Sequence, residues 1–187
     1  MSSYLSSTAR EKEAEDKIKI AVDMRTSILG AEHPHTLSSM ANLASTYQKQ
    51  GRWKEAEELQ VTVLAATKRV LGPEHPYTLS SMAILTWTYQ NQGRWTEAEK
   101  LEVMVLEARK RVLGPEHPDT LSSMANLAHT LHGLGRTREA ITTMTDVLVH
   151  RTAELGVNHP DTKASQLTIR SWNEVLRKSF TIQRLYD

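Results

Sequence analysis

The chain has 187 residues, with 23 Lys and Arg against 22 Asp and Glu, so its formal net charge at pH 7 is +1. This balance disfavours a nucleic-acid partner, because such proteins carry a broad basic stripe that grips phosphates. The absence of cysteine excludes disulfides, thiolate zinc sites and a cysteine nucleophile. The first residues lack a signal peptide's apolar core, and no apolar run reaches the about 18 residues of a membrane span. We therefore expect a cytoplasmic protein, with the nucleus as the alternative and no membrane partner.

The dipeptide His-Pro returns every 42 residues, at His33-Pro34, His75-Pro76, His117-Pro118 and His159-Pro160. Residues 29–70 align with residues 71–112 without a gap, and 12 of the 42 pairs differ. Such a fixed period is typical of a solenoid, in which each unit packs only on its neighbours. Stacked repeats present one long surface to another molecule, whereas an enzyme needs unlike residues that converge in one pocket. The period therefore favours recognition over catalysis.

In chain order, residues 1–9 are expected to be a flexible N-terminus, and residues 10–28 a lone helix. Glu13-Ala14-Glu15 matches Glu55-Ala56-Glu57 in the following repeat, so this lone helix occupies the place of a second helix whose first helix is absent. The array thus starts in the middle of a unit, which suggests a fragment of a larger protein.

Residues 29–70 form the first full repeat, which reads as two helices. After His33-Pro34, apolar residues recur at spacings of three and four until Gly51, and the same spacing resumes from Trp53. This periodicity indicates two amphipathic helices joined by a short turn. Gly72 suits the left-handed residue beyond the end of the second helix, and Pro73 prevents its continuation.

The same pattern predicts full repeats at residues 71–112 and 113–154 and a capping helix at residues 155–187. The fold class is therefore all-α: a right-handed α-solenoid of stacked antiparallel helical hairpins. We expect eight helices in a single array over residues 10–187, with the first helix of each repeat lining a concave face.

Small side chains are expected where two helices of a hairpin touch, because only these let the helix axes approach closely. They recur at Ala44, Ala56, Ala98 and Ala140. Trp53 and Trp95 are large enough to fill the wedge between neighbouring hairpins. The third repeat has Thr137 in that position, so we expect weaker stacking and fraying to begin there.

Three segments carry a resemblance to a known family: Leu71-Gly72-Pro73-Glu74-His75-Pro76 in the loop, Met124-Ala125-Asn126-Leu127-Ala128 in a first helix, and Gly51-Arg52-Trp53-Lys54-Glu55-Ala56 at a second. They resemble the tetratricopeptide repeat (TPR), in the 42-residue variant of kinesin light chains, over about residues 13–170. The Gln-Gly-Arg-Trp sequence also resembles the repeat tails of large fungal receptor proteins of the NACHT or NB-ARC kind.

What the resemblance implies is a non-catalytic scaffold that binds a peptide or a partner protein in the concave groove. The asparagine that often bonds a bound peptide's backbone in this family corresponds to Asn42 and Asn126, and Ile84 and Thr168 replace it elsewhere. Trp87 is the sharpest single candidate, since an exposed Trp is a favoured hot spot, although it could instead pack onto a neighbouring helix. The implied groove residues are Asn42, Ser45, Lys49, Ile84, Trp87, Asn91, Asn126, His129 and His132.

Two other functions stay open. The first is an architectural or self-associating module, with homo-oligomers formed through exposed terminal helices. The second is an RNA-binding helical repeat, which the neutral groove disfavours. His129 and His132 are three residues apart and could bind a metal or make binding pH-sensitive, but closed metal sites need three or four ligands. We therefore expect no metal site, no cofactor and no catalytic residue.

Overall fold

The computed structural model describes the backbone of residues 2–183 and the side chains of residues 12–178. Over this range the chain forms eight helices and no strands, which confirms the expected all-α architecture of helical hairpins. Chain contacts divide it into two compact units, residues 1–92 and 93–187. Each unit is described by itself, and the single array over residues 10–187 stays a prediction.

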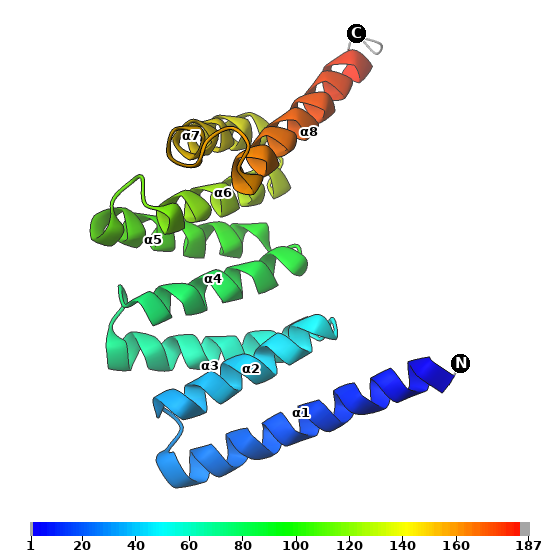
Figure 1. The fold of residues 1–187 in the computed structure, drawn as a ribbon, viewed down its shortest axis with the longest axis vertical. Helices are drawn as coiled ribbons and strands as arrows, with labels where there is room; N and C mark the ends of the chain where they lie inside the picture. Colours follow the sequence, from blue (N-terminus) through cyan, green and yellow to red (C-terminus); the bar gives the residue numbers. More distant parts are fainter. Residues whose placement is uncertain (1, 184–187) are drawn as a thin grey trace. The chain divides into compact units, whose positions relative to one another are not determined.

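The first unit contains α1 (Ser2–Leu29), α2 (Pro34–Lys49), α3 (Trp53–Leu71) and α4 (Pro76–Asn91). Each helix packs on the next one along the chain, as Figure 1 shows. Helix α1 begins at Ser2, before the expected start at residue 10. The sequence explains this difference, because neither Gly nor Pro interrupts the chain before Gly30.

The second unit contains α5 (Trp95–Leu113), α6 (Pro118–Gly133), α7 (Thr137–Leu155) and α8 (Pro160–Gln183). Successive helices again pack on one another. The capping helix was expected over residues 155–187, and residues 184–187 lie outside the described backbone.

The His-Pro dipeptides fix where the first helices begin. In each loop the histidine is the N-cap, and its Nδ1 accepts a hydrogen bond from the backbone N–H two residues later, at 3.2 Å for His33 and 3.1 Å for His75. The proline that follows is the first helical residue, where its missing N–H costs nothing. At the other end, Gly72 has φ of +95° beyond α3, as the sequence predicts. The histidines are therefore structural caps.

Small residues lie at the centre of each hairpin. Ala44 and Ala56 are fully buried between α2 and α3, and Ala128 and Ala140 between α6 and α7. The equivalent position on α4 holds Thr86, which is also buried and donates its hydroxyl to the Met82 carbonyl at 3.0 Å. A larger side chain at these positions would push the paired helices apart.

The tryptophans after the hairpin turns contact the next first helix, as the wedge prediction requires. The Trp53 ring meets the Trp87 ring of α4 edge-on, with centroids 5.3 Å apart. The Trp95 ring lies so close to α6 that a Cβ on Gly133 would come within 2.5 Å of it. In the third repeat Thr137 replaces the tryptophan and lies 3.1 Å from His132 Nδ1. Fraying of this repeat stays a prediction.

Replacing Ala56 with Leu tests the close approach of α2 and α3. We expect the free energy of unfolding to fall by about 1–3 kcal/mol, because the added atoms have no space to occupy. Urea denaturation followed by circular dichroism measures the change. Ala65→Leu is the matched control, since Ala65 lies on the exposed side of the same helix. An equal effect of both substitutions would contradict this account of the packing.

Candidate partner-binding site

The nine predicted groove residues all lie on first helices, and none is buried. Within the first unit, α2 carries Asn42, Ser45 and Lys49, and α4 carries Ile84, Trp87 and Asn91. Within the second unit, α6 carries Asn126, His129 and His132. The structure therefore places two separate sets of side chains where a partner can reach them, one in each unit.

Trp87 combines the two roles that the sequence left open. Its ring packs edge-on against Trp53, yet 48% of the residue stays exposed. Asn91 Nδ2 donates a hydrogen bond to the Trp87 carbonyl at 2.8 Å, one turn further along α4. The Trp87 ring thus packs on Trp53 on one side and still offers a large apolar surface.

A small hollow opens between α2 and α4. Ala41 of α2 forms one side of it and Ile84 of α4 the other, and Val63 and Gln60 of α3 also line it together with Ser81. Ile84 is 44% exposed at this hollow, one turn before Trp87. Residues of two adjacent first helices and of the second helix between them therefore line this hollow within the first unit.

Polar side chains cross the interior next to this hollow. Gln48 Nε2 donates to Thr88 Oγ1 at 2.8 Å, and Thr88 Oγ1 donates to Gln60 Oε1 at 2.7 Å. Gln48, Thr88 and Gln60 are all buried. This chain of hydrogen bonds links α2, α4 and α3 and fixes the orientation of the Gln60 amide, because its oxygen is the acceptor.

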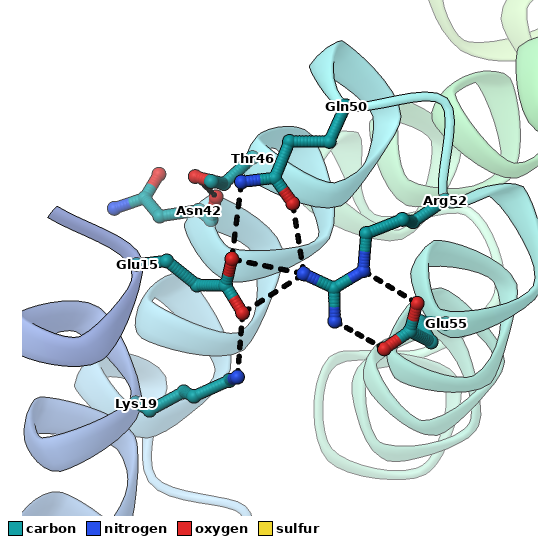
Figure 2. A network of polar contacts seen from close by, with 7 residues as sticks. All are labelled: Glu15, Lys19, Asn42, Thr46, Gln50, Arg52 and Glu55. Atoms are coloured by element: carbon teal, nitrogen blue, oxygen red, sulfur yellow. Dashed lines mark hydrogen bonds and ion pairs between the residues drawn. The ribbon is translucent and has the colours of Figure 1, made fainter. Parts of the chain in front are cut away.

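An ion-pair network holds α2 between α1 and α3 beside Asn42 (Figure 2). Arg52 donates through one Nη to the Glu15 carboxylate at 2.9 Å and binds Glu55 as well. Hydrogen bonds from Lys19 and Arg52 hold the pKa of the buried Glu15 carboxyl at about 2. Figure 2 shows the Asn42 amide apart from this network, and the residue is exposed. Asn42 is therefore placed on a fixed helix with its side chain accessible.

In the second unit the predicted histidines pack against the C-terminal helix. Trp172 of α8 is buried, and its ring stacks on His132 with centroids 4.8 Å apart and meets His129 edge-on at 5.1 Å. Burial, and then the neighbouring His132, lower the pKa of His129. Among residues 12–178, no three His, Asp or Glu side chains are grouped so as to hold a metal ion. The imidazole rings of His129 and His132 thus take part in the packing of α6 against α8.

An arginine clamp, which the sequence analysis missed, joins second helices to the following first helices. Arg109 Nη1 donates to Ser123 Oγ at 2.7 Å, and Arg151 Nη1 donates to Ser165 Oγ at 3.0 Å. Arg25 makes the same bond to Ser39 in the first unit. The 42-residue alignment already indicated this clamp. Arg25, Arg109 and Arg151 occupy equivalent positions, and Thr67 stands at the remaining one.

Glu102 is a buried acid that the sequence analysis also missed. It replaces Gln60 one repeat later, is 4% exposed, and accepts a hydrogen bond from Thr130 Oγ1 at 2.8 Å. Burial raises the pKa of its carboxyl to about 7, although the bond from Thr130 opposes the rise. The alignment shows the Gln-to-Glu change, but burial at this position is a property of the packed helices.

Comparison with known proteins gives a consistent result. The family model for the tetratricopeptide repeat matches residues 5–60, 36–110 and 88–148. None of the curated proteins matches significantly. No helix in the described part of the chain is long and apolar enough to cross a membrane.

Several solved structures are similar. The putative kinesin light chain nearly identical TPR-like repeats of Podosopora anserina match with a TM-score of 0.80 and 30% identity, over 96% of this chain and 85% of that chain. A variant of the same protein matches with a TM-score of 0.81 and 29% identity over the same shares. BtubC (BKLC) from P. vanneervenii matches at 0.71 and 18% identity, over 81% of this chain and 60% of that one, and this likeness shows the fold alone.

Replacing Glu102 with Gln should change how stability depends on pH. The folded-state pKa of about 7 exceeds the ordinary 4.5, so the folded parent binds this proton more tightly than the unfolded chain does. The parent therefore loses stability as pH rises from 4.5 to 7. Relative to the parent, Glu102→Gln should gain up to ~3 kcal/mol between pH 5 and pH 8.

Urea denaturation of both proteins at these two pH values measures this gain. Glu107→Gln, at an exposed position of the same helix, is the control. A stability difference between parent and Glu102→Gln that stays constant with pH would refute the assignment.

Proposed function

Because the chain belongs to the tetratricopeptide repeat family, we propose that it is a non-catalytic scaffold that binds a peptide or a partner protein along its first helices. The family and its kinesin-light-chain-like relatives support a protein-interaction role in general. The binding mode is our proposal: in the first unit the partner lies across α2 and α4.

The observation that carries this proposal is the exposed apolar surface at Ile84 and Trp87. These residues are 44% and 48% exposed on one side of α4, beside the hollow between α2 and α4. Both positions differ from the preceding repeat, where Asn42 and Ser45 stand. Aromatic residues with fixed orientation dominate binding energy at protein interfaces. The exposed apolar surface at Ile84 and Trp87 is absent from the equivalent positions of the preceding repeat. It therefore favours binding of a specific partner at α4.

Polar residues around this surface would bind the peptide backbone. The exposed amides of Asn42 and Asn91 can each donate and accept hydrogen bonds. Lys49 supplies a positive charge at the end of α2. In the second unit, we expect Asn126 and the exposed part of His129 to contribute in the same way. The resemblance to fungal receptor tails adds the proposal that the array works within a longer protein.

Trp87→Ala tests the proposed surface. We expect it to weaken the binding of selected partners more than tenfold, because an aromatic hot spot contributes at least about 2 kcal/mol. The measurement is a peptide-library selection and a proteome pulldown, followed by titration calorimetry with the peptides obtained. Val61→Ala removes an apolar side chain of similar exposure from α3 and is the matched control.

Circular dichroism must first show unchanged helix content in both variants. If the parent and Trp87→Ala retrieve the same partners with equal affinity, the surface on α4 is not the binding site.

Self-association is the second candidate function, and one observation on α1 favours it. Ile20, Met24 and Ile28 follow one another at intervals of four and are 57%, 56% and 74% exposed. Such a stripe would be covered by a second copy of the chain. Sedimentation equilibrium at high concentration tests this: a mass near 21.1 kDa contradicts assembly, and a concentration-dependent increase that Met24→Lys abolishes supports it.

A further inference from the structure

The first unit lacks the arginine clamp at the point where its hollow opens. In three other places an arginine donates to the serine 14 residues later, on the following first helix. At the corresponding position α3 has Thr67, which is buried and donates to the Leu64 carbonyl at 3.1 Å. Ser81 therefore receives no arginine. Its hydroxyl donates to the Tyr77 carbonyl at 2.9 Å, which leaves its oxygen able to accept a hydrogen bond.

Gln60, which lines the same hollow, has an unused donor. Gln60 is 4% exposed, and its oxygen is occupied by Thr88, but its Nε2 has no hydrogen-bond partner. A buried amide nitrogen without a partner destabilises the folded protein, so a group that binds it gains affinity. Gln60 and Ser81 both line the hollow, whose remaining walls are Ala41, Val63 and Ile84.

We infer that this hollow binds a carboxamide, supplied by an asparagine side chain of the bound peptide. Its carbonyl oxygen accepts from Gln60 Nε2, and its NH₂ group donates to Ser81 Oγ. This inference rests on the proposed function, because it assigns one residue of the peptide that lies across α2 and α4.

The chemistry of the lining distinguishes a carboxamide from charged groups. None of the five lining residues carries a charge. A carboxylate would therefore enter without a cation to balance it, and an ammonium group has no acceptor for the Gln60 donor. A carboxamide is neutral and presents one acceptor and two donors. The apolar walls Ala41, Val63 and Ile84 can contact the single methylene of an asparagine side chain.

We expect access to the Gln60 amide to depend on Ile84, which lines the same hollow. Gln60 Nε2 is covered in the free protein, whereas Ile84 is 44% exposed at the edge of the hollow. We expect a change of the Ile84 rotamer to widen this edge of the hollow, and such changes at exposed side chains are fast. Ile84→Ala should consequently strengthen carboxamide binding.

The hollow can be tested without knowledge of the partner. The full chain, labelled with ¹⁵N, is titrated with acetamide, acetate and methylammonium while the Gln60 side-chain NH₂ signals are followed by NMR. We expect acetamide to shift these signals and the two ions to leave them unchanged. Equal shifts with all three probes, or none with acetamide, would overturn the assignment and leave the hollow as a site for water.

Two variants sharpen this test. Gln60→Met removes the donor at nearly constant volume, and Met144 already occupies the corresponding position two repeats later. Thr67→Arg restores the residue found in the other repeats and engages Ser81. With Ser81 backbone signals as the readout, both should weaken acetamide binding at least threefold, whereas Ala65→Leu on the exposed side of α3 should not. Unchanged binding in both variants would refute the roles of Gln60 and Ser81.

A peptide library separates this inference from the proposed function. The parent should select peptides with asparagine at one fixed position, and Gln60→Met should lose that preference while it still binds peptides through Trp87. If selected peptides depend on Trp87 but show no asparagine preference, the carboxamide inference fails alone. If the parent selects no peptide, the proposed function fails, and the acetamide titration still decides whether the hollow binds a carboxamide.

Discussion

The fixed positions of the helix ends are the constraint on which the rest of the structure depends. Each first helix starts at a histidine cap followed by proline, and each second helix stops before a glycine with positive φ. The first helices α2, α4 and α6 all have 16 residues and the second helices α3, α5 and α7 have 19, and the hairpins α2–α3 and α6–α7 are each joined at fully buried alanines. Since the scaffold is set by these few residues, the remaining positions are free to differ between repeats.

Three of the 12 differences between residues 29–70 and 71–112 fall at positions that are buried in the first repeat, namely Ala44, Gln60 and Thr67. Along the chain, one buried position changes from Gln60 to Glu102 to Met144, and the clamp position changes once, at Thr67. The first change alters the polarity of the interior and the second removes a cross-helix bond. Changes of this kind give each repeat its own chemistry on a common scaffold.

The sequence predicted the helices well because its signals were local and repeated. Glycine and proline mark the helix ends, and the spacing of apolar residues marks the helices between them. Because the repeats are similar, the same pattern recurs in each and supports the same assignment. The hollow and the unpaired Gln60 nitrogen were beyond such reasoning, because they depend on how α2, α3 and α4 pack. The double role of Trp87 was undecided for the same reason. The alignment showed that Thr67 replaces an arginine. The consequence, a missing bond to Ser81, became clear only from the arginine–serine hydrogen bonds of the other repeats.

The contact between Trp95 and Gly133 restrains how such an array can evolve. Repeats of equal length can be duplicated or deleted as whole units, because each one packs mainly on its neighbours. The Trp95 ring, however, leaves no space for a Cβ at position 133, whereas earlier repeats carry Lys49 and Asn91 at the equivalent place. A repeat is therefore adapted to the one before it. A change in the order of the repeats would place the Trp95 ring against a residue larger than glycine. We therefore expect selection to conserve the order of the repeats as well as their number.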